Sequence, residues 1–207
     1  MFNRGLDKRN VFVNKKEFGR AKDLIKFYRH KETPQRFSKV SLQPTNIREK
    51  ILANLYQTER IVDILAYCLM PNHFHFLLQQ NSPKGISNFI ANFTNAYTRY
   101  SNTKHTRIGP LFEGVFKAVY IESEEQLLHL SRYIHINPVV SSLVKDNQIQ
   151  NYPWSSYREY LSLAKDGIAE KDLVLSMFKS VGNYQEFVSD QINYAKKLET
   201  IKHLTLE

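Results

Sequence analysis

The sequence contains a single cysteine, Cys68, among its 207 residues. One thiol excludes an internal disulfide framework and any metal site built from several cysteines. Cys68 lies in the apolar run from Ile61 to Met70, so we expect it to be a small buried side chain. No stretch approaches the roughly 18 apolar residues that span a bilayer, and the first residues do not resemble a signal peptide. We therefore expect a cytoplasmic protein.

Acidic residues are scarce relative to basic ones. The chain has 20 Asp and Glu against 29 Lys and Arg, which gives a formal net charge of +9. A basic surface of this size favours polyanions, and nucleic acid is the commonest such partner. Charge alone does not decide the matter, because many basic proteins bind no nucleic acid. Hydrophobic residues make up 42% of the chain and charged residues 24%, which is typical of a globular protein with a hydrophobic core.

Two helices are predicted in the first 60 residues. Lys15 to Tyr28 carries apolar residues at helical spacing, and so does Asn46 to Tyr56. The basic, proline-marked stretch between them, from His30 to Pro44, is predicted to be a loop.

The middle of the chain predicts a hairpin followed by a helix. The strand-like runs Ile61 to Leu69 and His73 to Gln79 are separated only by Met70-Pro71-Asn72. Ser82-Pro83 then has the pattern of a helix start, with a serine cap and proline in the first turn. Apolar residues keep the helical period from there through Ser101.

A loop, a strand and a helix are predicted next. Residues 102–114 are basic and contain glycine, and Val115 to Ile121 has strand character. Ser123 begins a capping-box pattern that ends at Gln126. The helix that follows is expected to stop near Asn137, because Pro138 disfavours helical geometry in the residue before it.

Strands that alternate with helices, together with a tight hairpin, predict an α+β fold. We expect a ferredoxin-like sandwich, with helices packed on a mostly antiparallel sheet, and a small helical C-terminal subdomain. The expected division is a catalytic domain over residues 1–150, with a long insertion at about 30–60, and a helical extension over residues 151–207.

Two histidines two residues apart form the first candidate site. His73 and His75 fall in the second predicted strand, where alternate side chains leave the same face roughly 7 Å apart. Two imidazoles placed in this way can bind one metal ion. Ordinary polar residues on the solvated face of a sheet explain this fragment at least as well.

A second candidate group lies on the helix that follows Ser123. His129, Tyr133 and Asn137 are spaced four residues apart and therefore share one helix face. A tyrosine and an amide one turn apart could place a nucleophile beside a metal-ligand oxygen. An amphipathic helix in which Tyr133 packs partly in the core and Asn137 caps the end is the simpler interpretation of this segment alone.

Several motifs, in order along the chain, resemble a known family. Residues 70–78 look like the His-hydrophobic-His signature of the single-tyrosine HUH transposases, also called IS200-like transposases, and residues 132–139 are similar to their nucleophile helix. The closer resemblance is to the REP-associated tyrosine transposases. The further motifs that fit are Asn3-Arg4-Gly5, Gly109-Pro110-Leu111-Phe112-Glu113-Gly114, Phe116-Lys117 and Tyr152-Pro153-Trp154-Ser155-Ser156-Tyr157. Together they cover about residues 3–160. The sequence departs from the family at Val115, where an arginine is common.

The resemblance implies a metal-dependent enzyme that cleaves and rejoins single-stranded DNA. Tyr133 would be the nucleophile, and His73, His75 and Asn137 would hold a divalent ion, Mg²⁺ or Mn²⁺. The implied product is a 5′-phosphotyrosine link with a free 3′-hydroxyl. The implied partner is single-stranded DNA with hairpin or palindromic structure. A monomer is favoured, with a homodimer as the alternative.

Six basic residues are candidates for phosphate contacts. They are Arg4, Lys8, Arg9, Lys104, Arg107 and Lys117. Plain solvated charge is an equal alternative for them. Tyr97 and Tyr100 could stack on bases, but their helical spacing favours core packing. We expect His129 to be solvated or to contact DNA rather than to transfer a proton, and His135 to pack away from Tyr133.

Three other functions compete with this one. A non-catalytic protein that binds DNA or RNA hairpins has no need of all four central residues. A relaxase or replication initiator would use the same chemistry, but the single candidate tyrosine and the REP-associated motifs argue against it. A basic α+β scaffold without a nucleic acid partner leaves the order of the motifs unexplained.

Overall fold

The structure is a computed structural model that describes residues 1–192. These residues form two compact units, each described here by itself. The first unit comprises Met1–Ile64, Pro71–Phe74 and Leu78–Ala118, and the second comprises Leu65–Met70, His75–Leu77 and the chain from Val119 onward. The predicted extension beyond residue 192 lies outside the described residues.

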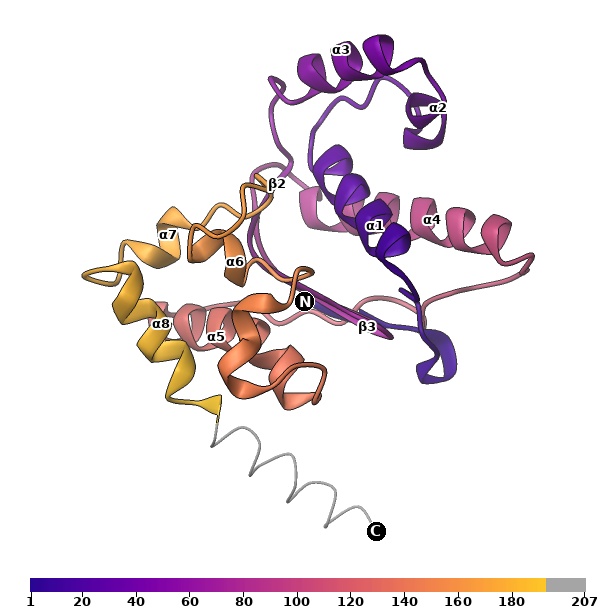
Figure 1. Ribbon diagram of the computed structural model, residues 1–207. Coiled ribbons are helices and arrows are strands. Elements are labelled where there is room, and N and C mark those ends of the chain that lie inside the picture. Colours follow the sequence, from indigo (N-terminus) through magenta and orange to yellow (C-terminus); the bar gives the residue numbers. More distant parts are fainter. Residues whose placement is uncertain (193–207) are drawn as a thin grey trace. The chain divides into compact units, whose positions relative to one another are not determined.

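A three-stranded sheet contains the predicted hairpin. Strand β1 (Phe2–Arg4) pairs with β3 (His73–Gln80), and β3 pairs with β2 (Val62–Met70), in the order β1-β3-β2. The α+β class is confirmed (Figure 1). The strand predicted at residues 115–121 is wrong, since this segment makes an isolated bridge between Lys117 and Phe2 instead. Its apolar side chains are exposed, Val115 by 83%, so no core packing holds it in a sheet.

The first unit contains four α-helices and a short 3-10 helix, η1 (Leu6–Lys8). The α-helices are α1 (Lys15–Tyr28), α2 (Phe37–Ser41), α3 (Thr45–Leu55) and α4 (Gly85–Lys104). Helices α1 and α3 confirm the predicted ones, and Asn14 caps α1 by accepting a hydrogen bond from the backbone N–H of Glu17. Helix α2 corrects the prediction of an uninterrupted loop before Pro44; its Phe37 and Val40 are buried, which stabilises one short helical turn.

Helix α4 begins three residues later than Ser82. Lys84 has a left-handed backbone with φ of 58°, so the chain is not helical until Gly85. A Cβ atom at residue 85 would lie 2.2 Å from the carbonyl oxygen of Ile61, and only glycine allows this approach. The proline pattern therefore marks the turn before the helix and not its first turn. The helix also runs to Lys104, three residues past the predicted end.

Aromatic side chains form much of the core of the first unit. Phe74 of β3 lies edge-to-face with Phe93 of α4, with ring centroids 5.2 Å apart, and with Phe112 at 5.5 Å. Tyr97 is fully buried, and its hydroxyl donates to the carbonyl oxygen of Val11 at 2.9 Å. Core packing rather than base stacking is confirmed for Tyr97.

Helix α5 (Glu124–Val140) is the longest helix among the described residues of the second unit. Ser123 caps it by accepting from the N–H of Gln126, so this half of the predicted capping box is confirmed. The Gln126 side chain accepts from the N–H of Glu122 and not from that of Ser123, so the reciprocal half differs from the prediction. The predicted end near Asn137 is wrong, because Pro138 lies inside the helix. Proline in the last turn removes one backbone donor, and the carbonyl of Asn137 still accepts from Ser141 at 2.9 Å.

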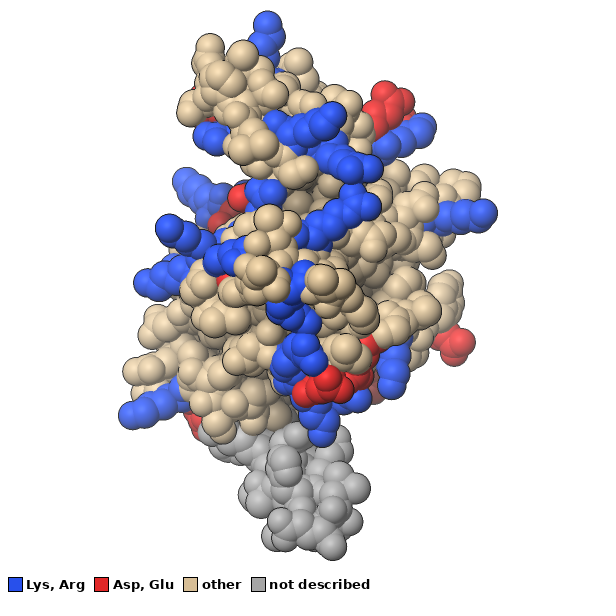
Figure 2. All heavy atoms as spheres, turned by 90° about the vertical axis from the view of Figure 1, so that its right-hand side faces the viewer, with Lys and Arg blue, Asp and Glu red and all other residues tan. Residues whose placement is uncertain are grey.

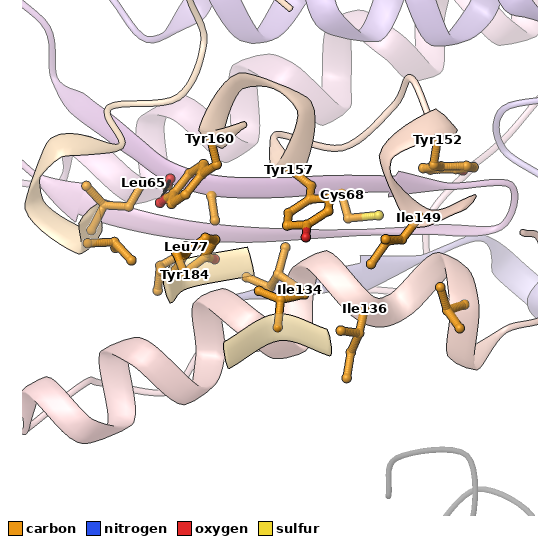
Figure 3. Close-up of a cluster of buried hydrophobic side chains, with 14 of the residues drawn as sticks. Leu65, Cys68, Leu77, Ile134, Ile136, Ile149, Tyr152, Tyr157, Tyr160 and Tyr184 are labelled. Carbon is orange, nitrogen blue, oxygen red and sulfur yellow. Dashed lines mark hydrogen bonds between the residues drawn. The ribbon is translucent and has the colours of Figure 1, made fainter. Parts of the chain in front are cut away.

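The shorter helices of the second unit follow α5. They are η2 (Asp146–Asn151), α6 (Tyr157–Tyr160), α7 (Asp172–Leu175) and α8 (Val181–Ser189). Their apolar side chains join those of β2, β3 and α5 in one core (Figure 3), which includes Leu65, Cys68, Leu77, Ile134, Tyr160 and Tyr184. Burial of Cys68 is confirmed.

The Tyr-Pro-Trp-Ser-Ser-Tyr motif covers the edge of β2. The backbone N–H of Leu69 donates to the carbonyl of Trp154 at 2.9 Å, and Ser156 donates to Tyr67 at 3.0 Å. The hydroxyl of Tyr152 donates to the carbonyl of Leu69 at 2.7 Å. These bonds satisfy strand groups that would otherwise be unpaired at a sheet edge. The motif therefore has a structural role in the second unit.

Among the described residues, no helix has the length and apolar character needed to cross a membrane.

Candidate functional site

Strand β3 places the two candidate histidines on one face. Phe74 and Phe76 are fully buried, whereas His73 and His75 are partly exposed, as alternation along a strand requires. Leu77 continues the histidine face and packs in the core of the second unit. The predicted shared face is therefore confirmed. Leu77, two residues after His75, anchors this part of the strand in the core.

The environment of His73 favours a neutral imidazole. Burial lowers the pKa of His73 to about 4, and the positive charge of Arg4 adds to the effect. Its Nδ1 lies 2.7 Å from Oδ1 of Asn72, an atom that can only accept, so Nδ1 carries the proton. The lone pair then resides on Nε2. A neutral imidazole oriented through its other nitrogen is the usual form of a histidine metal ligand.

Tyr133 is exposed on a segment that is otherwise buried. From Ser131 to Val139 every residue except Tyr133 is buried, and Tyr133 is 49% exposed. Its ring lies edge-to-face with that of His75, with centroids 5.6 Å apart and an interplanar angle of 89°. Tyr133 is therefore accessible to a substrate while its ring is held against His75.

Asn137 lies one turn after Tyr133 and is 6% exposed. Its Nδ2 donates to the carbonyl oxygen of Tyr133 at 2.7 Å. The amide nitrogen therefore donates to the helix backbone. The other amide atom, Oδ1, is an oxygen of the type that hard divalent ions prefer as a ligand. The second unit therefore brings together His75, Tyr133 and Asn137, and His73 lies two residues from His75 on the same strand face.

Several other tyrosine hydroxyls are used in the cores. The hydroxyl of Tyr160 donates to the carbonyl of Leu65 at 2.8 Å, and that of Tyr67 donates to Glu159 at 3.2 Å. Burial raises the pKa of Tyr160 and that of Tyr67 well above the ordinary value. Neither can attack a phosphate in the folded protein. Tyr120, by contrast, is 82% exposed, but it lies outside the helices and strands.

The donor set fits a divalent ion. Two imidazoles and one amide oxygen, without a thiolate, are the residue types that suit ions such as Mn²⁺ and Mg²⁺. No group of three His, Cys, Asp or Glu side chains is placed to hold a metal elsewhere in the described part of the chain.

Both histidines of α5, His129 and His135, contact neighbouring side chains. Arg132 donates through Nη2 to Nδ1 of His129 at 2.7 Å, and the His129 ring lies 6.1 Å from that of Phe187. His135 is fully buried, with Nδ1 2.7 Å from the hydroxyl of Tyr184 and Nε2 2.7 Å from that of Ser156. The packing role predicted for His135 is confirmed.

The six basic candidates all belong to the first unit. Arg4 forms an ion pair with Glu113, Arg9 one with Asp7, and Lys104 one with Glu17. Lys8, Arg107 and Lys117 form no ion pair with any residue in the range 1–192. Figure 2 shows a face on which Lys and Arg side chains are much more frequent than Asp and Glu. Such a face suits a polyanion.

Asn72 and Arg132 lie within the two motifs at residues 70–78 and 132–139, but the sequence predicted no role for either. Asn72 orients His73, and Arg132 lies with its guanidinium carbon 4.0 Å from the centre of the Phe187 ring, beside His129. Asn72 directly precedes the first histidine, which is a signal that could have found it. The contact of Arg132 could not be predicted, because its partner Phe187 is 55 residues away in the sequence.

Comparisons with known proteins give one family match and one similar solved structure. A family model described as "Transposase IS200 like" matches residues 35–137, a range that contains His73, His75, Tyr133 and Asn137. A search of curated protein sequences gave no significant match. Among solved structures, a REP-associated tyrosine transposase bound to a REP hairpin is similar, with a TM-score of 0.52 and 17% identity. The similarity covers 80% of this chain and 81% of that one, and it shows a shared fold.

Proposed function

The chain belongs to the IS200-like transposase family, and we propose that it cleaves and rejoins single-stranded DNA with Tyr133 as the nucleophile. The observation that carries this proposal is the placement of Tyr133. It is the exposed residue of a buried helical segment, and its ring lies against His75.

In the proposed reaction the phenolic oxygen of Tyr133 attacks the scissile phosphorus in line with the bond that breaks. A P–O bond to Tyr133 forms and the phenolic proton passes to solvent, while the P–O3′ bond breaks and the leaving 3′ oxygen takes up a proton from solvent. The products are a 5′-phosphotyrosine link and a free 3′-hydroxyl. The reverse attack by a 3′-hydroxyl reseals the strand, and no external energy source is needed because the number of phosphodiester bonds is unchanged.

Three residues have the donor atoms for a metal ion in this reaction. His73, His75 and Asn137 would hold Mg²⁺ or Mn²⁺, which when bound supplies Lewis-acid polarisation of the scissile phosphate. Asn72 would fix the tautomer of His73, and the hydrogen bond from Asn137 to the Tyr133 carbonyl would orient its amide. These contacts are the outer-shell support that metal ligands usually have.

Tyrosine suits a reversible transfer. Its phenolic pKa, about 10, lies well below that of an alcohol, so the phenolate is the better leaving group when the strand is resealed. The edge contact with His75 holds the ring while leaving nearly half of the side chain exposed to a substrate.

We infer that the substrate is single-stranded DNA with hairpin or palindromic structure and that the protein acts in the manner of a REP-associated transposase, as a monomer. The similar structure holds a REP hairpin. The net charge of +9 supports a polyanionic partner. Lys8, Arg107 and Lys117 form no ion pair with an acidic residue in the range 1–192. Contacts of this kind position the phosphate backbone without reading sequence.

A covalent-adduct assay tests the proposal. The protein is incubated with a labelled single strand that carries an imperfect palindrome, with Mn²⁺ or with a chelator, and separated on a denaturing gel. We expect an adduct with the 3′ fragment of the strand, which carries the 5′ phosphate, and only in the presence of the metal. Tyr133→Phe should form none.

Tyr120→Phe is the matched control, since it removes the hydroxyl of another exposed tyrosine in the second unit. It should form the adduct at the wild-type level. Adduct that persists in Tyr133→Phe contradicts the assignment of the nucleophile. Wild-type protein that binds the hairpin but forms no adduct would instead support a non-catalytic hairpin-binding protein.

A further inference from the structure

A cavity of about 670 Å³ lies within the first unit, apart from the residues of the proposed catalytic site. Its walls come from α1, α4 and residues 33–38, which belong to the insertion predicted at about 30–60. The volume falls within the usual range for a small-molecule site, about 300–1,000 Å³. The insertion therefore does more than lengthen a loop, because it completes the wall of a cavity.

The lining of the cavity is cationic. Arg20, Arg36, Arg99 and Lys104 contribute positive charges, and no Asp or Glu belongs to the lining. Lys104 forms an ion pair at 2.6 Å with the buried carboxylate of Glu17, which does not line the cavity. Arg36 and Arg99 are exposed side chains at the cavity that form no ion pair with a described residue. The cavity is thus suited to an anion.

Arg20 is held at the cavity by two aromatic rings. Its guanidinium carbon lies 4.4 Å from the centre of the Phe37 ring and 5.1 Å from that of Tyr100. Its Nε is buried and has no hydrogen-bond partner among residues 1–192. A buried N–H without an acceptor is unfavourable, so an acceptor supplied by a ligand would be stabilising. Asp23 is the acidic residue that influences Arg20 electrostatically, and it is exposed and outside the lining.

The remaining lining groups suit a heteroaromatic base. Tyr100 is a half-buried ring at the cavity, and base stacking on such rings is a common mode of nucleic acid recognition. Gln35, Asn92 and Asn95 add amide groups, each of which can both donate and accept hydrogen bonds. A bare phosphate would use the cations and leave the amides and most of the volume without a role.

We propose that this cavity binds a single nucleotide unit, with its phosphate on Arg20, Arg36 and Arg99 and its base among Tyr100 and the amide side chains. The unit can come from a free nucleotide or from one position of a nucleic acid strand, since both present the same phosphate and base. This site is separate from Tyr133 and does not require cleavage.

The experiment uses the full chain with Tyr133→Phe, so that binding is measured without reaction and independently of the proposed nuclease function. The probes are the four deoxynucleoside 5′-monophosphates, the corresponding nucleosides, inorganic phosphate and unstructured oligodeoxynucleotides. Binding is measured by titration calorimetry at fixed salt, because phosphate contacts depend on ionic strength. The test variant is Arg36→Gln/Arg99→Gln.

Arg48→Gln/Lys50→Gln is the control, since it removes the same charge from α3, outside the lining. We expect at least one nucleotide, or the oligonucleotide, to bind, and the test variant to weaken that binding about tenfold or more. The control should stay near wild type. Binding of mononucleotides identifies a free nucleotide as the ligand, and binding of the oligonucleotide alone identifies a strand.

Three results would overturn the proposal. One is the absence of binding by every nucleotide and oligonucleotide. Another is inorganic phosphate that binds as tightly as the nucleotides, since the base would then add nothing. The third is equal weakening in the test and control variants, because general charge and not the cavity would then explain the binding. None of these results bears on adduct formation by Tyr133, which is scored separately.

Discussion

The rings of His75 and Tyr133 meet edge-to-face, with their centroids 5.6 Å apart, although the two residues are 58 positions apart in the sequence. The contact joins a strand residue to a helix residue in the second unit. One partner is a candidate metal ligand and the other a candidate nucleophile. Their contact places the candidate nucleophile beside one candidate metal ligand.

Loss of a metal ligand should separate cleavage from binding. We expect His75→Ala and Asn137→Ala to reduce metal-dependent adduct formation by about 100-fold or more, because the phosphate would lose its polarisation. Hairpin affinity, measured by gel shift in a chelator, should change little. His129→Ala is the control, as its ring contacts Arg132 and Phe187 rather than Tyr133. Equal loss of activity in His129→Ala would contradict the ligand assignment.

Glu17 should make stability depend on pH in the acid range. Burial by itself raises the pKa of Glu17, but hydrogen bonds from Lys104, the N–H of Val13 and His105 outweigh it, so the pKa is lowered. A lowered carboxyl pKa stabilises the fold above the ordinary value, about 4.3, and this contribution disappears as the pH falls towards the folded-state pKa. Glu17→Gln should therefore be less stable than wild type at pH 7. It should also lose less stability between about pH 5 and pH 3 in urea titrations; parallel curves for the two proteins would exclude this role.

Lys104 was a candidate phosphate contact, and the structure pairs it with the buried Glu17. We expect Lys104→Ala to lower the melting temperature, because the buried carboxylate loses a partner. Lys117→Ala should leave the melting temperature unchanged, since the Lys117 side chain is exposed and the residue is held by hydrogen bonds between its backbone and that of Phe2. Both variants can weaken DNA binding. A melting temperature of Lys104→Ala equal to that of wild type would show that the pair with Glu17 contributes nothing to stability.

Two buried tyrosines provide a matched pair for stability. The hydroxyl of Tyr184 contacts Nδ1 of His135 at 2.7 Å and donates to the hydroxyl of Ser131 at 3.3 Å. The hydroxyl of Tyr157 is buried and has no hydrogen-bond partner among residues 1–192. We expect Tyr184→Phe to cost about 1–3 kcal/mol of unfolding free energy, because it leaves a buried imidazole nitrogen unsatisfied. Tyr157→Phe should be neutral to within about 0.5 kcal/mol or stabilising. Chemical denaturation measures both, and a larger loss for Tyr157→Phe would contradict the hydrogen-bond assignment.

Local patterns were enough to predict most of the regular structure. The apolar spacing from Lys15 to Tyr28 and the short turn at Pro71 left one reasonable interpretation each, and both are confirmed. The predictions that proved wrong concern segments whose structure depends on contacts with residues distant in the sequence. The position of Gly85 beneath the Ile61 carbonyl delays α4, and the exposed Val115 has no core to pack on. Pro138 does not end α5, because the last turn of a helix tolerates the loss of one backbone N–H donor.

By itself the sequence determined the alternation that puts His73 and His75 on one strand face, and the helical spacing that aligns Tyr133 with Asn137. Both are consequences of backbone geometry within a single element. The tertiary structure alone decided that Tyr133 is exposed among buried neighbours and in contact with His75, and that Arg20 lines a cationic cavity with residues of the insertion. Burial and contact depend on side chains brought together from distant parts of the chain, and no local period encodes them.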